Sequence, residues 1–430
     1  MNKSIDVVVV GGGIAGLIAA TKAARGGATT VLLDGHPVGG RARSVVRDGF
    51  TLNNGPHAVY KAGRLMGTLK DMGIALTGGP PVYKGAGTLF DGEVIPLPTG
   101  AGGLMRTKML RPTSRVRAAR LLATAQRIDP APWAGRPLQS WLDTMPDDLA
   151  VLIHLLIRTA SYVNAPDTLD AAAAVVQLQL ALKGALYVDG GWQRIVDELQ
   201  AAAIGAGVDV RQSSAVRTVA CTDGGVTVTM TSDEDEVRAA VAIVAAGSPE
   251  LTARLVGSPI DGADRIGAAV EASVLDLGTS SVPQTPLLFG SVEPLYLSTH
   301  APAARLAPEG MALVSLMHYI TPGSSPVDVK AAQTELFHLG RRAGIEDGDI
   351  VLQRYLHRVT VSQGYPTAAG GGLAGRPTIT GTGLGNVLIA GDWVGPHGLL
   401  ADASAASAVE AATAALRTVH ARRSSSPAGR

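Results

Sequence analysis

Three glycines near the N-terminus have the spacing of a phosphate-binding turn. Gly11, Gly13 and Gly16 form a G-x-G-x-x-G motif between a β-branched run at residues 7–10 and an alanine-rich, helix-like segment at residues 14–25. The first glycine allows the tight turn, the second lets the backbone approach a pyrophosphate, and the third lets the helix pack closely on the strand. The unpaired N–H groups and the positive dipole end of that helix attract phosphate. Because strand, glycines and helix occur in this order, the sequence predicts a dinucleotide site.

Charged residues extend the predicted site beyond the glycines. Asp34 ends a second strand at residues 29–33, about 20 residues downstream, where a carboxylate can accept hydrogen bonds from an adenosine ribose. Arg41 and Arg43 lie in the turn that follows, and a guanidinium there would neutralise charge left on a pyrophosphate. The alternative interpretation of this turn is a solvated basic loop.

Length and composition describe a folded protein of more than one domain. The chain has 430 residues, 46% hydrophobic and 17% charged, and a single core seldom grows past about 250–300 residues. Its net charge of +1 gives no support for a nucleic-acid partner. Cys221 is the one cysteine, which excludes an intramolecular disulfide and a cysteine cluster for zinc; no metal site is predicted. We expect this cysteine to be buried in a strand.

The same features suggest a location in the cell. A chain with so little cysteine fits a reducing compartment, and we expect a cytoplasmic protein. Asp6 interrupts the first apolar run, which argues against a secretory signal peptide. No uncharged apolar run reaches the roughly 18 residues that a spanning helix requires.

A new unit is predicted to begin near residue 80, where short β segments alternate with glycine and proline. Residues 106–127 then form a helix-like segment with seven basic residues and no acidic one. Such a helix could make a weak peripheral contact with an anionic membrane. We favour the alternative, a solvated basic face. The sequence does not indicate an oligomeric state.

The last quarter of the chain contains a second buried strand, at residues 386–391, that ends in glycine and the acid Asp392. An Ala/Ser-rich helix at residues 401–417 follows, and residues 422–430 are expected to be a disordered tail. Residues 370–375 repeat the glycine pattern of the first motif, but no strand precedes them and no helix follows. We therefore predict one nucleotide site, not two.

Several short motifs together resemble the flavin-containing amine oxidase and phytoene desaturase superfamily of FAD proteins. Besides the opening glycine turn, they are residues 39–44 (GGRARS), 55–57 (GPH), 190–192 (GGW) and 390–393 (AGDW). The resemblance implies an α/β fold with a glutathione-reductase-type, Rossmann-like FAD-binding domain and an inserted α+β substrate domain. The FAD-binding domain would comprise residues 1–80, 184–255 and 360–421, and the substrate domain residues 81–183 and 256–359.

The resemblance also implies a role for individual residues. Asp392 would lie near the pyrophosphate and the ribityl hydroxyls, and Arg41 near the phosphates. Leu400 and Ala401, at the start of the last helix, would face the flavin pyrimidine, where the helix dipole favours the anionic reduced ring. The full set of expected FAD ligands is Gly11, Gly13, Ile14, Ala15, Gly16, Asp34, Gly40, Arg41, Ser44, Gly55, Pro56, His57, Val216, Ala246, Gly247, Gly391, Asp392, Leu399, Leu400 and Ala401.

The expected function is that of an FAD-dependent oxidoreductase. It would remove a hydride from a C–H bond, next to nitrogen or in a desaturation, of a modest-sized organic or hydrophobic substrate. A single nucleotide motif favours O2, a quinone or another diffusible electron acceptor over a dedicated NAD(P)H domain. The candidates for catalytic residues that line the flavin face are His57, Tyr60, Tyr296, His300, Tyr319, Trp393 and His397. For each of them we favour a place in the pocket wall or core over a role as general base.

Two other functions stay open at this point. A flavin-dependent isomerase or cyclase would use the same site without net redox change. A non-catalytic binding protein, similar to prenyl-protein escorts, would share the fold without FAD, but the presence of Asp34, Arg41 and Asp392 argues against it. No equivalent of the lysine and aromatic pair of the amine-oxidase branch is evident, and residues 396–398 look closer to the desaturase branch.

Overall fold

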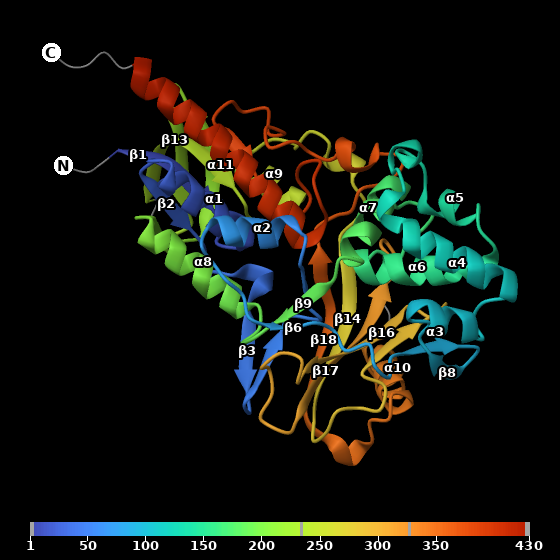
Figure 1. Ribbon diagram of the computed structural model, residues 1–430. Coiled ribbons are helices and arrows are strands. Elements are labelled where there is room, and N and C mark those ends of the chain that lie inside the picture. Colours follow the sequence, from blue (N-terminus) through green and yellow to red (C-terminus); the bar gives the residue numbers. More distant parts are fainter. Residues whose placement is uncertain (1–3, 233–234, 326–327, 426–430) are drawn as a thin grey trace.

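A computed structural model describes residues 4–232, 235–325 and 328–425 of the chain (Figure 1). It contains two seven-stranded sheets, so the predicted mixed α/β fold is confirmed. The first sheet has the order β10-β2-β1-β13-β12-β11, with β19 beside β13. Its strands are β1 (Ile5–Val10), β2 (Thr30–Leu33), β10 (Asp209–Arg211), β11 (Val216–Thr222), β12 (Gly225–Met230), β13 (Glu236–Val244) and β19 (Val387–Ile389).

The centre of the first sheet is parallel and fully buried. β1 pairs in parallel with both β2 and β13, and β13 pairs in parallel with β19. Residues 7–10 of β1 are all valine and at most 3% exposed, as expected for a strand covered on both faces. The helices that share its core include α1 (Ile14–Arg25), α8 (Gln193–Gly205) and α11 (Leu400–Ser425). Figure 1 shows α1, α8 and α11 gathered on this sheet.

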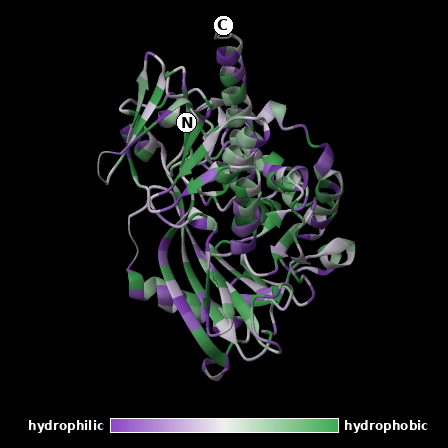
Figure 2. Ribbon diagram, turned by 90° about the vertical axis from the view of Figure 1, so that its left-hand side faces the viewer, coloured by the Kyte–Doolittle hydropathy of each residue, from purple (hydrophilic) through white to green (hydrophobic). Residues whose placement is uncertain are grey.

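The second sheet is mostly antiparallel, in the order β18-β14-β17-β16-β15-β7-β8. Its strands are β7 (Gly87–Phe90), β8 (Glu93–Pro96), β14 (Val270–Thr279), β15 (Leu287–Gly290), β16 (Leu295–Ala301), β17 (Ala312–Ile320) and β18 (Ile350–Ser362). Successive side chains of β14 point to opposite faces of this sheet, so they pack in two different cores. Val274 packs with α6 (Asp147–Ser161) and α7 (Ala171–Ala181), whereas Leu275 packs with α10 (Val329–Arg342). In Figure 2 the long edge strand of this sheet carries hydrophilic stretches, as expected for β18.

Short elements connect the two sheets. The remaining strands are β3 (Ser44–Arg47), β4 (Phe50–Asn53), β5 (Val59–Tyr60), β6 (Gly78–Gly79) and β9 (Ala185–Val188), and further helices are α2 (Arg64–Asp71), α5 (Leu138–Leu142) and α9 (Pro249–Val256). β9 pairs with β5 and with β6. In Figure 1, β6 and β9 lie between the two large sheets.

The basic segment is not one helix, as predicted, but two. α3 (Gly100–Arg106) ends before α4 (Pro112–Thr124) begins, because Pro112 starts a new helix at its first position. Arg115 turns inward, and its guanidinium donates to the carbonyls of Leu110, Met105 and Thr107, which closes the bend between the helices. None of the helices in the described part of the chain has the length and apolar character needed to cross a membrane.

Two other expectations were wrong. Cys221 is exposed, because β11 is an edge strand of the first sheet and has no neighbour on its outer side. The last helix does not end at residue 417 but continues to Ser425, into the segment expected to be a disordered tail. Arg423 of that extension pairs with Asp6 at 2.6 Å, which ties the helix end to the first strand. Residues 426–430 lie outside the described part.

Candidate active site

A cavity of about 530 Å³ opens beside the glycine turn. Its lining includes residues of β14 and β18 of the second sheet, of the first turns of α1 and α11, and of loops that follow strands of the first sheet. The lining residues are Gly13, Ile14, Ala15, Arg41, Gly55, Pro56, His57, Tyr60, Tyr162, Trp192, Gly247, Val274, Leu356, Val359, Gly391, Asp392, Leu400, Ala401 and Asp402, among others. Twelve of the twenty predicted cofactor ligands are in this set, so the fold brings most of them to one place.

The three motif glycines have different reasons to be glycine. Gly11 has a φ of +102°, and a Cβ there would lie 2.6 Å from the carbonyl oxygen of Ala245. At Gly16 a Cβ would overlap the carbonyl oxygen of Gly11. A Cβ at Gly13 would meet nothing within 4 Å. The protein's own packing therefore requires the first and third glycine but not the second, which leaves open space at the N-terminus of α1 for a bound group such as a phosphate.

Asp34 lies outside the cavity lining, next to the glycine turn. Its carboxylate accepts hydrogen bonds from the N–H of Gly12 at 2.6 Å and of His36 at 2.8 Å. The N–H of Ser214 donates to the Asp34 carbonyl at 2.8 Å, which brings the start of β11, with Val216, to the same place. The residues expected to hold adenosine therefore cluster together, beyond one end of the cavity.

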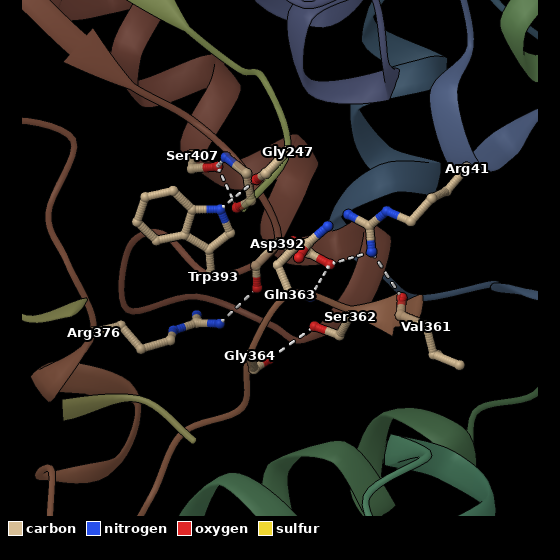
Figure 3. A network of polar contacts seen from close by, with 11 residues as sticks. Arg41, Gly247, Val361, Ser362, Gln363, Gly364, Arg376, Asp392, Trp393 and Ser407 are labelled. Atoms are coloured by element: carbon tan, nitrogen blue, oxygen red, sulfur yellow. Dashed lines mark hydrogen bonds and ion pairs between the residues drawn. The ribbon is translucent and has the colours of Figure 1, made fainter. Parts of the chain in front are cut away.

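Arg41 and Asp392 form an ion pair across the site (Figure 3). The guanidinium donates to Oδ2 of Asp392 at 2.8 Å and to the carbonyl of Val361 at 3.0 Å, and the N–H of Gln363 donates to the same Oδ2 at 3.2 Å. Asp392 is 3% exposed, whereas Arg41 is 41% exposed. The second carboxylate oxygen of Asp392, Oδ1, is buried and has no partner among the described residues. A ligand hydroxyl would satisfy it, so the site fits the ribityl chain of FAD.

Five of the aromatic and histidine candidates do not line the cavity. Tyr319 is 1% exposed and packs edge-on against Tyr162. Trp393 points away from Arg41, is 1% exposed and donates its indole N–H to the Gly247 carbonyl at 2.9 Å (Figure 3). His300 stacks on Tyr187 at 4.2 Å, with 2% exposed. Tyr296 packs against Phe289 in the α6–α7 core, and His397 is exposed on a turn. Residue type alone does not show which way a side chain points from its strand or turn.

His57 and Tyr60 do line the cavity. Nδ1 of His57 lies 2.8 Å from the carbonyl of Gly55, so this nitrogen carries the hydrogen, and the ring edge contacts Trp192 at 4.7 Å. The pKa of His57 is lowered to about 4. Burial is the largest cause, the hydrogen bond to Gly55 acts in the opposite direction, and the neighbouring cations Arg41 and Arg354 contribute to the lowering. The ring is thus neutral near pH 7 and leaves Nε2 as an acceptor. Tyr60 donates to the Ala160 carbonyl at 2.7 Å, and burial raises its pKa.

Several predicted ligands support the site without lining it. Ser44 donates to Oδ1 of Asn53 at 2.7 Å and accepts from the N–H of Gln193 at 3.1 Å, so its hydroxyl holds two loops together. The predicted ligands outside the cavity lining are Gly11, Gly16, Asp34, Gly40, Ser44, Val216, Ala246 and Leu399.

Sequence reasoning missed several residues of the lining, among them Tyr162, Trp192 and Asp402. Tyr162 ends α6 in the left-handed conformation, and its hydroxyl donates to the Pro56 carbonyl at 2.8 Å. No local pattern marks that contact. Asp402 was recognisable, because an acid in the first turn of a helix that follows a glycine-rich turn is a candidate for charge interactions at that helix end.

Buried histidines should make the protein sensitive to acid. Burial lowers the pKa of His300 to about 3, so the folded state binds a proton there far less readily than the unfolded chain. The free energy of unfolding should therefore fall as the pH drops below about 6.5. His300→Phe keeps a ring beside Tyr187 but removes the titrating group. The free energy of unfolding, measured in urea, should therefore differ between pH 7.5 and pH 4.5 by about 2–3 kcal/mol less in this variant than in the unaltered protein. The exposed His397→Gln is the control, and an equal reduction of this difference there would contradict the prediction.

Comparisons with known proteins agree with the geometry. The chain matches the family model for flavin containing amine oxidoreductase over residues 14–416. An oxidoreductase from Methanosarcina mazei superposes with a TM-score of 0.74 at 17% identity, over 94% of this chain and 99% of that one. Putrescine oxidase bound to putrescine gives 0.72 at 16% identity, over 95% and 98%. Cyclohexylamine oxidase from Brevibacterium oxydans IH-35A gives 0.67 at 16%, over 97% and 100%. No curated sequence matches significantly.

At these identities the solved structures establish a shared fold and nothing about substrate. The family follows from the match over residues 14–416, which covers every strand of the two large sheets except β1 and every lining residue from Ile14 to Ser404. The chain therefore belongs to the flavin-containing amine oxidoreductases, a family of FAD-binding oxidoreductases.

Proposed function

We propose that this protein uses FAD to remove a hydride from a C–H bond of an uncharged, largely apolar substrate of modest size. Bound FAD would supply the hydride acceptor, and the protein would bind, orient and shield the substrate from water. The backbone at Gly13 and Ala15 would hold the pyrophosphate, Asp34 the ribose, and Asp392 a ribityl hydroxyl. The neutral Nε2 of His57 would accept a hydrogen bond in the cavity.

The observation that carries this proposal is the apolar lining that the second sheet gives to the cavity, namely Val274, Leu356 and Val359. Of the two carboxylates in the described lining, Asp392 is paired with Arg41, and Asp402, at the start of α11 where the flavin would lie, accepts a hydrogen bond from the N–H of Leu65. A protonated amine against the apolar walls would lose its hydration without compensation. An uncharged C–H donor suits such walls better than a diamine does.

We further propose that the two sheets divide the work. The strands of the first sheet fall within residues 1–80, 184–255 and 360–421, which would form the FAD-binding domain of the glutathione-reductase type. Residues 81–183 and 256–359 supply most of the second sheet and its helices and would form the substrate domain. β18 crosses that boundary, and its residues line the cavity, so it would join substrate recognition to the cofactor.

Anaerobic mixing tests the proposed function. The FAD-loaded protein is mixed with neutral compounds that carry an allylic or benzylic C–H bond, and separately with putrescine and cyclohexylamine. Persistent bleaching of the flavin by neutral compounds, with little bleaching by the amines, supports the proposal. Faster bleaching by the amines would overturn the substrate class. Product formed while the flavin stays oxidised would instead support an isomerase or cyclase. After reduction, admitting O2 or a quinone identifies the electron acceptor.

The exposed cations of residues 106–127 permit a weak contact with anionic membranes, which is the alternative to the solvated face favoured above, and vesicle binding decides between the two. Six cations are exposed there beside the apolar side chains of Met105 and Val116, which are 51% and 61% exposed. The cations are Arg106, Lys108, Arg111, Arg117, Arg120 and Arg127. Each cation near a charged bilayer contributes on the order of 1 kcal/mol, so R117E/R120E should weaken vesicle binding at least tenfold at low salt. Cosedimentation with phosphatidylserine vesicles measures this.

The control for that prediction reverses two exposed cations on other faces, K70E/R217E. It should bind the vesicles nearly as the unaltered protein does. Equal sedimentation with phosphatidylcholine vesicles, or no binding at any salt concentration, would show that the basic face is only solvated.

A further inference from the structure

The carboxylate of Asp402 connects the first turns of two helices. Asp402 lies in the first turn of α11, and its Oδ1 accepts a hydrogen bond from the N–H of Leu65, in the first turn of α2, at 2.8 Å. It is 5% exposed. Gly63, the residue before α2, leaves the room for this contact, since a Cβ there would overlap both carboxylate oxygens. Two helix N-termini, each with a partial positive charge, therefore converge on one buried acid.

Asp402 is also part of the cavity wall, together with Leu400, Ala401 and Ser404. The adenosine end of FAD belongs near Asp34, outside this cavity, and the pyrophosphate belongs at the start of α1. The half of the cofactor that remains, with its redox-active ring, must then occupy the cavity that Asp402 lines. This step rests on the proposed function.

The charged and titratable groups around Asp402 are few. From α2 it faces the N–H of Arg64 and, at longer range, the Arg64 guanidinium, whose side chain is exposed. From β5 it faces Tyr60, which is neutral near pH 7. Across the cavity, Arg41 is already paired with Asp392. Burial raises the pKa of Asp402 to about 6, although the N–H groups of Leu65 and Arg64 and the Arg64 charge lower it. Among the described residues, Arg64 is the cation whose charge lowers this pKa, and Asp402 forms no ion pair there.

We propose that Asp402 takes up a proton from solvent when the cofactor bound in this cavity is reduced. A flavin that accepted a hydride would gain two electrons, one hydrogen and one negative charge, and the substrate would gain one positive charge, which leaves with the oxidised product or as a proton released to solvent. A new negative charge beside a buried carboxylate disfavours its ionised form. One proton from solvent then binds to the Asp402 carboxylate and restores the net charge of the cavity. The protonated acid still accepts from Leu65 through its carbonyl oxygen, so the connection to α2 is kept.

Asp402 is therefore a positioning residue that couples the reduction of the cofactor to a proton. Both helix ends stabilise negative charge in this cavity, and the ionised acid and the reduced ring compete for them. Neutralising the acid on reduction removes that competition. The cofactor would consequently be reduced more readily at low pH than its own proton requirement explains.

The midpoint potential of the FAD-loaded protein, measured between pH 5 and pH 8, tests this inference. For a two-electron couple each proton taken up adds about 30 mV per pH unit to the slope. In the unaltered protein, the slope of the midpoint potential against pH should correspond to about two protons per two electrons at pH 7 and should fall towards one proton below about pH 6. Proton uptake at pH 7, followed with an indicator dye in weak buffer while the flavin is reduced electrochemically through a viologen mediator that delivers electrons and no protons, should be about two per flavin.

Asp402→Asn keeps an acceptor for Leu65 but has no proton site. It should hold FAD, keep a one-proton slope across the whole range and take up about one proton per flavin. Asp170→Asn is the matched control. Asp170 is also a buried helix cap, which accepts a hydrogen bond from the N–H of Ala173 at 2.8 Å, and burial raises its pKa as well. Unlike Asp402, it does not line the cavity. This variant should behave like the unaltered protein.

Two results would overturn the inference. One is an unaltered protein with the same one-proton slope from pH 5 to pH 8, which needs no variant. The other is an Asp402→Asn protein that still takes up two protons, or an Asp170→Asn protein that loses one. A protein that binds no FAD at all would instead contradict the proposed function.

Discussion

Gly13→Ala should leave the protein folded and weaken FAD binding by at least about a hundredfold, or about 3 kcal/mol. A Cβ at Gly13 meets no protein atom within 4 Å, so the substitution does not strain the turn. It does fill the open space at the N-terminus of α1, where backbone N–H groups would contact the phosphates. Fluorescence titration of the apoprotein with FAD measures the affinity, and thermal unfolding of the apoprotein measures stability.

Two further glycines serve as controls for that prediction. Gly67 lies in α2, and a Cβ there also meets nothing within 4 Å, so Gly67→Ala should change neither FAD affinity nor fold. Gly16→Ala should instead destabilise the apoprotein, because its Cβ would overlap the Gly11 carbonyl oxygen. Unaltered FAD affinity in Gly13→Ala would mean that no phosphate lies at this turn.

Arg41→Ala should destabilise the apoprotein more than Asp392→Ala does. Removal of the arginine leaves a carboxylate that is 3% exposed, with the Gln363 N–H as its one hydrogen-bond donor among the described residues and the Arg376 charge nearby, at a cost of roughly 2–4 kcal/mol. Removal of the aspartate leaves a guanidinium that is 41% exposed and can be hydrated, at a cost of about 1 kcal/mol. Urea unfolding of both apoproteins at pH 7 gives the comparison.

Both variants should also lose FAD affinity, since the cation and the unsatisfied Oδ1 of Asp392 face the expected cofactor site. The order of the two apoprotein stabilities is the decisive part. If Asp392→Ala costs more than Arg41→Ala, the pair does not serve to neutralise a buried carboxylate, and the ribityl role of Asp392 would lose its support.

The sequence predicted well what is encoded by contiguous residues. The phosphate turn uses residues 11–16 between one strand and one helix, so its motif is visible without a fold. The strand that ends at Asp392 was visible for the same reason: an apolar run followed by glycine and an acid. What each element packs against depends on neighbours far away in the chain, and that was not visible.

The contacts between distant parts of the chain around the cavity show this limit. Tyr162 reaches Pro56 across 106 residues and Arg41 reaches Asp392 across 351, and no local pattern announces either contact. Trp393 has the residue type of a flavin neighbour, but its position places the ring in the core against Gly247. The break between α3 and α4 was missed because the spacing of the arginines was given more weight than Pro112.

The stoichiometry of FAD binding tests the central claim most directly. The apoprotein is titrated with FAD while heat is recorded calorimetrically, and its folded state is checked by circular dichroism. One FAD bound per chain, with FMN at least tenfold weaker because it lacks the adenosine that Asp34 would hold, is the result expected. A folded protein that binds no FAD, or binds FMN equally well, would contradict the assignment of the glycine turn and Asp34 to the dinucleotide.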